Sequence, residues 1–525
     1  MTADALLAQI DILTRTVGLR DEALKAAQLL IDKLKLELSY LKRMRYGRAS
    51  EQLDHEAQLE LINAALAPVP AANDASQPTD SDIEASGGKR KAKARSALRE
   101  LPEHLPRHTV VHQPESGCAC ATCGVALREI GQDICEVLEY EPGNFHVTRH
   151  VRPKLACGGC HSITQAPAPS RPIERGLAGA GLLAHVLVSK YADHLPLYRQ
   201  SQIYAREGVM LERSTLCDWV AGAARLLTPL ARAIGSYVLQ AAKVHSDDTP
   251  TRALGGAQGR AHLGRLWAYV RDDRASADTA PPAVWFQYSA NRKGEHPSAH
   301  LRHYSGILQV DAFAGYNGCF EDGSILEAAC WAHARRKYFE IHKQQHQLPG
   351  TLAHQALHRI ARMYAVEADI RGQPPDIRMH QRQLRTRPIL DEMYDWLNAT
   401  LGQLSAKSPM ALAIGYSLSN WRALNRFAGD GRIEADNNIA ERALRAVAIG
   451  RKNYLHFGSD GGGESAAVIY TLLGTARLND INPQAYLRHV LERIADHPIN
   501  RVGELLPWVV AERIQKGHEQ LRRAA

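Results

Sequence analysis

Residues 6 to 41 carry apolar side chains at alternating steps of four and three, which is the spacing of a heptad repeat. Branched Ile10, Val17 and Ile31 fall at the first heptad position, with leucine at most of the fourth positions, a pattern that favours two parallel strands. Arg20, beside Gly18, weakens this seam. Residues 1–50 therefore predict a coiled-coil, leucine-zipper-like helix that joins copies of the chain, although a helix packed on its own protein would look the same. The seam comprises Leu6, Ile10, Leu13, Val17, Leu24, Ala27, Ile31, Leu34, Leu38 and Leu41.

The periodicity disappears in residues 65–99, which are rich in Ala, Pro, Ser, Asp and Gly and end in a basic run from Lys89 to Arg95. Such a composition buries too little apolar area to offset the entropy lost on ordering. We expect a disordered linker here. Its basic end either contacts phosphates or is solvated charge.

Residues 100–170 contain two Cys-x-x-Cys pairs with strand-like segments between them. Two such pairs make a closed, tetrahedral four-cysteine site for one structural Zn²⁺, with a hairpin or three-stranded sheet between the pairs. Cys118 competes with Cys120 for one ligand position, and four buried thiols without metal are the alternative reading. The predicted zinc ligands are Cys120, Cys123, Cys157 and Cys160.

Helical periodicity returns in residues 171–240, in runs that begin near Leu182, Tyr198 and Ser214. A glycine turn at Gly208 separates the second run from the third, and Ser214 suits a helix cap. A helix-turn-helix that reads DNA and plain helical packing beside a catalytic core both fit this pattern.

Residues 241–480 then show strand-like runs, followed by a helical stretch at about 335–430 and by further helices. Four consecutive strands followed by a fifth are typical of a ribonuclease-H-like sheet. Residues 335–430 would then be a helical insertion after the fifth strand. Residues 481–525 predict a C-terminal helical tail. The fold class is therefore multidomain α+β: coiled coil, four-cysteine zinc domain, helical domain and ribonuclease-H-like α/β catalytic core. The strand-like runs are Lys243–Asp247, Arg265–Arg271, Val284–Tyr288, Gly306–Asp311 and Ile325–Cys330.

Three acidic residues lie at positions that a ribonuclease-H-like core would bring close together. Asp247 and Asp311 end two strand-like runs, and Glu441 lies early in a helical run. Carboxylate oxygens are the ligands that hard divalent cations prefer, and a pair of such cations can clamp the attacking and leaving oxygens of a phosphoryl transfer.

Two of the three acids have a competing candidate nearby in the sequence. Asp248 competes with Asp247, but neighbours on a strand point to opposite faces, so only one of them can enter the site. Glu434 and Asp436 compete with Glu441, which also fits a capping pair with Asn438. On a helix Asn437, Glu441 and Arg445 share one face, which would flank the carboxylate with an amide and a guanidinium suited to phosphate.

The charge balance is compatible with a polyanionic partner. The 525 residues include 64 Lys and Arg against 56 Asp and Glu, a net charge of +8. No apolar run is long enough to span a membrane, and the polar start Met1–Asp4 is unlike a signal peptide. We therefore expect a cytoplasmic protein with no membrane partner.

Six segments together resemble the DDE transposases of insertion sequence family sixty-six, in the order of that family and over nearly the whole chain. The three acid segments are joined by a Cys-x-x-His segment, a basic segment after Glu441 and an early Tyr-Gly-Arg segment. The segments are Val244–Pro250, Ile307–Asp311, Asn437–Arg442, Cys330–Arg336, Ile449–Asn453 and Tyr46–Glu51.

The resemblance implies roles for individual residues. Asp247, Asp311 and Glu441 would be the catalytic acids and would hold two Mg²⁺ ions per active site, with Asp247 preferred to Asp248. His333 would contact the scissile phosphate, a buried core histidine being the alternative. The remaining predicted DNA-binding residues are Arg335, Arg336, Arg445, Arg451 and Lys452.

The implied function is that of a transposase, which binds the ends of its element, cleaves one strand and joins it to target DNA. Its partners would be both DNAs, a second copy in a homodimer or higher oligomer, and accessory transposition proteins. A non-catalytic zinc-containing DNA-binding regulator would not need the three acids. A metal-dependent nuclease of the same fold would cleave without joining.

Overall fold

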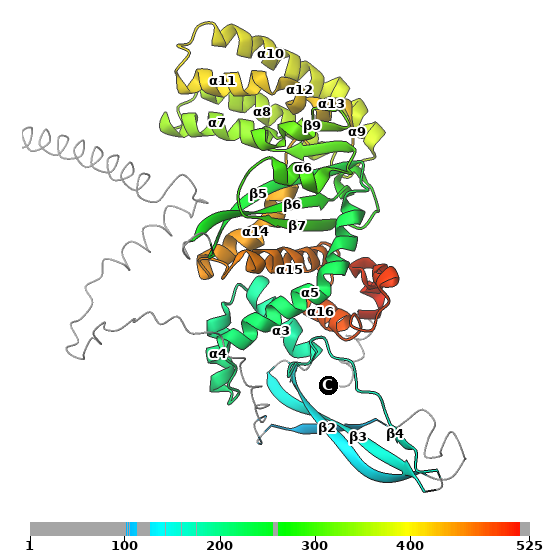
Figure 1. The fold of residues 1–525 in the computed structure, drawn as a ribbon. Helices are drawn as coiled ribbons and strands as arrows, with labels where there is room; N and C mark the ends of the chain where they lie inside the picture. Colours follow the sequence, from blue (N-terminus) through cyan, green and yellow to red (C-terminus); the bar gives the residue numbers. More distant parts are fainter. Residues whose placement is uncertain are drawn as a thin grey trace, which may run out of the picture. The chain divides into compact units, whose positions relative to one another are not determined.

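The computed structural model describes residues 101, 103, 105–112, 127–141, 143–158, 160–174, 176–255 and 261–514 (Figure 1). The chain divides into two compact units, Met1–Arg95 and Ser96–Ala525, and all described residues belong to the second. The predicted coiled coil, the predicted linker and the cysteines Cys118, Cys120 and Cys123 lie outside the described residues. Self-association through the heptad seam therefore stays a prediction.

The first sheet has the order β1-β3-β2, with β4 on β3. A long antiparallel hairpin of β2 and β3 turns at Gly143, whose φ of +90° is the left-handed conformation that glycine adopts most readily. This hairpin fills the interval between the two Cys-x-x-Cys pairs, as expected. The strands are β1 (Arg107–Val111), β2 (Leu127–Glu141), β3 (Asn144–Cys157) and β4 (Ile163–Gln165).

Three helices follow, at the positions that the apolar periodicity predicts. The first, α3, is buried on almost every side, and its Leu182 amide donates to Glu139 Oε1 of β2 at 2.7 Å. The cap assigned to Ser214 is wrong, because α5 already begins at Arg213 after Glu212 and has no side-chain cap. The helices are α3 (Ala180–Tyr191), α4 (Leu197–Arg206) and α5 (Arg213–Val238).

The second sheet has the order β7-β6-β5-β8-β9. β6 runs antiparallel to both of its neighbours, β5 and β7, whereas β5, β8 and β9 run parallel to one another. A turn or a short connection suffices between antiparallel strands, while parallel strands need a crossover. Here α6 (Glu295–Leu301) lies in the connection from β7 to β8. The strands are β5 (Lys243–Ala253), β6 (His262–Arg271), β7 (Ala283–Ser289), β8 (Gly306–Val310) and β9 (Ile325–Ala329).

The first strand is longer than its apolar run suggests. It was expected to end at Asp247, but β5 continues to Ala253 because its second half pairs with β6. Pro250 is accommodated there because beyond His245 β5 no longer pairs with β8, so the edge opposite β6 needs no amide donor at position 250. Asp247 therefore lies within a strand and not at its end.

Edge strand β7 is covered by α15 (Asp460–Leu478). The hydroxyls of Thr471 and Thr475 accept from the Phe286 and Val284 amides at 2.9 and 3.2 Å. An exposed strand edge invites pairing with another chain. These two threonines satisfy that edge, which explains two fully buried hydroxyls in an apolar helix.

The stretch after β9 is helical, as predicted, and builds a core of its own. Within it Arg382 is fully buried and donates to both carboxylate oxygens of Glu367, at 2.8 and 2.6 Å. The helices are α7 (Trp331–Gln344), α8 (Leu352–Asp369), α9 (Pro375–Gln381), α10 (Arg387–Leu401), α11 (Pro409–Ser419), α12 (Trp421–Leu424) and α13 (Arg426–Gly429), with a π-helical turn at Arg382–Thr386.

After the insertion, the chain returns to the sheet. The helix that carries Glu441, α14, lies against β5 and β6, and α16 packs on α3. These helices are α14 (Asn438–Asn453) and α16 (Pro483–Leu491). No helix in the described ranges is both long and apolar enough to cross a membrane.

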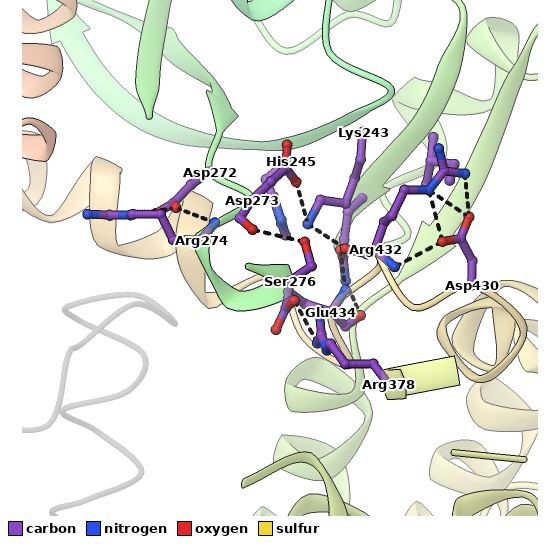
Figure 2. Close-up of polar contacts among 12 residues, drawn as sticks. Lys243, His245, Asp272, Asp273, Arg274, Ser276, Arg378, Asp430, Arg432 and Glu434 are labelled. Atoms are coloured by element: carbon purple, nitrogen blue, oxygen red, sulfur yellow. Dashed lines mark hydrogen bonds and ion pairs between the residues drawn. The ribbon is translucent and has the colours of Figure 1, made fainter. Parts of the chain in front are cut away.

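Lys243, at the start of β5, is a buried cation that links three segments (Figure 2). Its Nζ donates to the Arg432 carbonyl at 2.8 Å and lies 3.0 Å from Asp273 Oδ1, which follows β6. The side chain is only 1% exposed. The ammonium therefore holds the chain before α14 against the base of the sheet.

We predict that Lys243→Met lowers the free energy of unfolding by about 3–5 kcal/mol, because it leaves the Asp273 carboxylate without its cation. Arg387→Met removes an exposed ion pair with Asp391 and should cost less than about 1 kcal/mol. Urea denaturation measures both. Equal, small effects would show that Lys243 is dispensable.

Candidate active site

The register of β5 and β8 brings Asp247 and Asp311 together. Lys243 pairs with Ile307 and His245 with Gln309, so the same offset places Asp247 level with Asp311, directly after β8. The Asp247 carboxylate accepts from the Asp248 amide at 2.7 Å, and that of Asp311 from the Phe313 amide at 3.1 Å. Two acids from distant parts of the sequence thus lie on neighbouring strands.

The electrostatics of Asp247 reflect this proximity. Burial raises its pKa from 3.8 to about 8, and the negative charges of Asp311, Asp248 and Glu441 act in the same direction. Among the described residues Asp247 forms no ion pair. A carboxyl group with a raised pKa and no cation beside it is typical of a site that takes up positive charge.

Asp248 has the opposite environment. Its carboxylate lies 2.8 Å from Arg292 Nη2 and 2.9 Å from Arg265 Nη1, and its side chain is 1% exposed. Strand alternation sends Asp248 to one face of the sheet and Asp247 to the other. The two neighbours are therefore divided between an ion cluster and the candidate site.

Glu441 reaches the site from the first turn of α14. Its Oε1 is buried and has no hydrogen-bond partner among the described residues, and it lies 3.7 Å from His333 Nε2 of α7. The capping alternative is wrong, because the cap residue is Asn437, whose side chain makes no cap hydrogen bond, and the Asn438 amide donates to Asp436 instead. The Glu441 carboxylate is thus not used by the helix terminus.

His333 faces the acids and is not a core histidine. Its side chain is 23% exposed, and the charges of Asp311 and Glu441 raise its pKa against burial, which has the larger, lowering effect. The net shift is downward, so His333 is mostly neutral near pH 7.

The rival third acids are engaged elsewhere. Glu434 Oε1 lies 2.8 Å from Nη2 of Arg378, a guanidinium only 1% exposed (Figure 2). Asp436 Oδ1 accepts from the Asn438 amide at 3.1 Å, and burial raises the pKa of Asp436. Both acids have local structural partners, unlike Glu441.

Asn437 ties α14 to β5. Its Nδ2 donates to the Ser246 carbonyl at 2.8 Å, and its Oδ1 lies 3.0 Å from Nδ1 of His245. Burial keeps the pKa of His245 well below 6.5, so this ring is neutral and donates from Nδ1. Asn437 is fully buried. We expected its amide beside a metal, but the amide is occupied in positioning the helix.

Two further contacts hold the chain before α14. Gln309 of β8 donates to the Glu434 and Asp436 carbonyls, the second at 3.0 Å. The Trp331 amide at the start of α7 donates to the Ala435 carbonyl at 3.0 Å. The segment Glu434–Asn437 is thus fixed to β5, to β8 and to the end of β9. Sequence analysis missed Gln309, although a polar residue inside an apolar strand run was the available signal.

The predicted DNA-binding residues lie on the two helices that carry His333 and Glu441. Arg335 and Arg336 are exposed on α7, and Arg445 is exposed on α14. Arg451 differs, because its Nη1 donates to the Pro250 carbonyl and so joins the end of α14 to β5. Lys452 beside it is exposed.

The donor set fits a hard divalent cation. Three carboxylates face the same region, one oxygen of Glu441 is buried without a partner, and Asp247 has a raised pKa. In the described part of the chain, no three acidic, histidine or cysteine side chains are already gathered closely enough to form a metal-binding group. Like charges repel at short range, so side-chain rotation would accompany the binding of a cation here.

Half of the predicted zinc site is visible at the end of β3. Cys157 is buried, and the Cys160 amide lies 3.5 Å from its Sγ. The His161 amide donates to the Cys157 carbonyl at 3.0 Å, which closes a tight turn with a positive φ at His161. Amides that point at the first sulfur of a Cys-x-x-Cys pair stabilise a metal-bound thiolate.

Four protein-family profiles match the chain. They are described as "Transposase IS66 family" (residues 175–465), "IS66 C-terminal element" (471–508), "zinc-finger binding domain of transposase IS66" (117–161) and "Transposase C of IS166 homeodomain" (33–110). These matches define a transposase of an insertion sequence. Within that class, the chain belongs to the IS66 transposase family, which confirms the family predicted from the six motifs.

Full-length relatives occur in Sinorhizobium fredii. "Uncharacterized protein y4hP" is 38% identical over 496 residues, covering 92% of this chain and 88% of that protein. "Uncharacterized protein y4jD" is 38% identical over 487 residues, covering 90% and 94%. The similarity therefore extends along nearly all of both proteins.

The raised pKa of Asp247 predicts that the metal-free protein loses stability as pH rises. The folded state keeps this proton up to about pH 8, whereas the unfolded chain releases it near 3.8. Between these values the folded state binds more protons, so the free energy of unfolding falls with increasing pH. Asp247→Asn cannot release this proton, so its free energy of unfolding should fall by at least about 1 kcal/mol less than that of wild type over this pH range.

Urea denaturation in EDTA at about pH 5 and about pH 8 measures the difference. Asp395→Asn, on the exposed side of α10, is the control and should retain the wild-type slope. Parallel curves for wild type and Asp247→Asn would contradict the raised pKa of Asp247.

Proposed function

We propose that this protein is a DDE transposase that cleaves DNA at the ends of its element and joins the freed ends to target DNA. The observation that carries the proposal is the placement of Asp247 level with Asp311 on neighbouring parallel strands, with Glu441 on the helix against them. The sheet order β7-β6-β5-β8-β9, antiparallel and then parallel, supports a ribonuclease-H-like core.

In this proposal Asp247, Asp311 and Glu441 would hold two Mg²⁺ ions. These ions would activate the attacking water and neutralise charge that develops on the phosphoryl oxygens. Water attacks the scissile phosphorus and the bond to the 3′ oxygen breaks, which leaves a 3′ hydroxyl and a 5′ phosphate. The freed hydroxyl then displaces a 3′ oxygen in target DNA, so no covalent protein intermediate and no external energy source is required.

The surrounding residues have distinct proposed roles. Glu441 provides a carboxylate oxygen without a competing hydrogen bond. His333, neutral and 3.7 Å from Glu441, would contact the scissile phosphate. Arg335, Arg336, Arg445 and Lys452 would bind the DNA backbone, where contacts position the duplex without reading its sequence. Arg451, whose Nη1 donates to the Pro250 carbonyl, would contact the DNA backbone from the end of α14.

Asp247→Ala, Asp311→Ala and Glu441→Ala should each slow cleavage of an end-bearing oligonucleotide by at least about a thousandfold, because each removes a cation ligand. Binding of the same DNA should change little, since the basic contacts remain. Mg²⁺-dependent cleavage and strand joining are the measurements.

Asp436→Asn is the matched control, an acid five positions before Glu441 that should keep its activity. Activity retained in Glu441→Ala but lost in Asp436→Ala or Glu434→Ala would refute the choice of third acid. Cleavage without joining would favour a nuclease, and DNA binding without cleavage would favour a non-catalytic regulator.

We further propose one structural zinc, held by Cys120, Cys123, Cys157 and Cys160. The zinc-finger family match and the Cys157–Cys160 turn support this assignment. A closed site of four cysteines leaves no position for water, so the metal would stabilise the domain and not act in catalysis.

The purified protein should therefore contain about one zinc per chain, and Cys160→Ser should lose it. Cys135→Ser, on the hairpin but outside both pairs, should retain it. Elemental analysis distinguishes the variants. A well-folded protein without zinc would refute the site, and full zinc in Cys120→Ser would assign Cys118 as the ligand.

A further inference from the structure

Arg292, between β7 and α6, lies beside the candidate active site. Its Nε and Nη2 donate to Asp248 Oδ1 at 3.0 and 2.8 Å, and its guanidinium carbon is 3.7 Å from the centre of the Phe313 ring. Asp248 adjoins Asp247, and the Phe313 amide donates to Asp311. Although Asp248 points to the other face of the sheet from Asp247, the guanidinium is close enough to both proposed catalytic acids, Asp311 and Asp247, for their charges to act on it.

This guanidinium has a fixed orientation. The double hydrogen bond to Asp248 and the stacking on Phe313 restrain it from two directions. The loops that carry Arg292 and Phe313 also touch, because a Cβ on Gly294 would lie 2.6 Å from the Gly315 carbonyl oxygen. A ligand that meets Arg292 would find it already oriented.

The ion cluster formed by Asp248, Arg265 and Arg292 contains more positive than negative charge. Asp248 is shared by Arg265 and Arg292, so two cations face one carboxylate. Arg265 is 16% exposed and Arg292 36%, which makes Arg292 the more accessible. Among the described residues its Nη1 has no hydrogen-bond partner. Nη1 of the oriented Arg292 guanidinium is thus available to a ligand at the edge of the candidate active site.

We propose that Arg292 binds a DNA phosphate next to the scissile one, through Nη1, and that Asp248 is its positioning residue. This inference rests on the proposed function, because it assumes that the cleaved strand passes the three acids. A guanidinium suits this task because it stays charged and presents paired donors to phosphate oxygens. The competing explanation is that Arg292 only neutralises buried Asp248.

A cycle between protein and DNA substitutions separates the two explanations. Wild type and Arg292→Gln are compared on end-bearing DNA in which each phosphate flanking the scissile bond is replaced, one at a time, by an uncharged methylphosphonate. The full chain is used, and affinity is measured in EDTA, followed by the cleavage rate with Mg²⁺.

We expect Arg292→Gln to reduce affinity or rate by about 10- to 100-fold, the scale of one charge-assisted hydrogen bond. One methylphosphonate should be similarly harmful to wild type but nearly neutral to Arg292→Gln, because the contact is already lost. Arg292→Lys, which keeps the charge, should recover part of the affinity and of this coupling. It also tests the contact if the glutamine variant does not fold.

Arg274→Gln is the matched control. Arg274 makes the same double contact with Asp272, at 2.8 and 2.8 Å, beyond the other end of β6 (Figure 2). It should behave like wild type on every substrate. If the combined effect of Arg292→Gln and each methylphosphonate equals the product of their separate fold-changes, the two act independently and the proposed contact is refuted. Absence of cleavage by wild type would count against the proposed function alone, since the affinity cycle does not require cleavage.

Discussion

The buried side-chain amide of Asn437 is the contact on which the arrangement of the site depends. It joins the Ser246 carbonyl and the His245 ring of β5 to the first residue before α14. Asp247 follows Ser246 directly, and Glu441 lies one turn into the helix. A single side chain therefore sets the distance between a strand acid and a helix acid. A buried amide that loses its partners costs about 1–3 kcal/mol, so displacement of α14 is strongly opposed.

The carboxylates on the two faces of β5 have different electrostatic environments. On one face Asp248 is satisfied by Arg265 and Arg292, and on the other Asp247 forms no ion pair with any described residue and has a pKa near 8. Because side chains alternate between the two faces of a strand, the ion-paired carboxylate of Asp248 is separated from that of Asp247, the proposed metal ligand. Repulsion among Asp247, Asp311 and Glu441 is tolerated because the polar contacts of Gln309 and Asn437 fix the backbone around them.

The strands and the helical insertion could be predicted from sequence, because alternation and periodicity are local signals. The three acids were chosen as acids beside apolar runs, and the register of β5 and β8 places two of them, Asp247 and Asp311, level with each other. The role of Asn437 could not be predicted, since its partners on β5 lie almost two hundred positions away. Arg292, Lys243 and the buried Arg382 were missed for the same reason: tertiary packing selects their partners. The length of β5 was underestimated because pairing with β6, and not apolarity, extends it to Ala253.

The central claim is that three distant segments meet around divalent cations. Iron-directed cleavage of the polypeptide tests it most directly, because Fe²⁺ bound in place of Mg²⁺ reduces added hydrogen peroxide to hydroxyl radicals, which cut only nearby backbone. The account predicts cuts close to Asp247, Asp311 and Glu441 in one protein, all suppressed by excess Mg²⁺ and lost together in Asp247→Asn. Cuts confined to one of these segments, or centred on Glu434 and Asp436 without the other two, would contradict it.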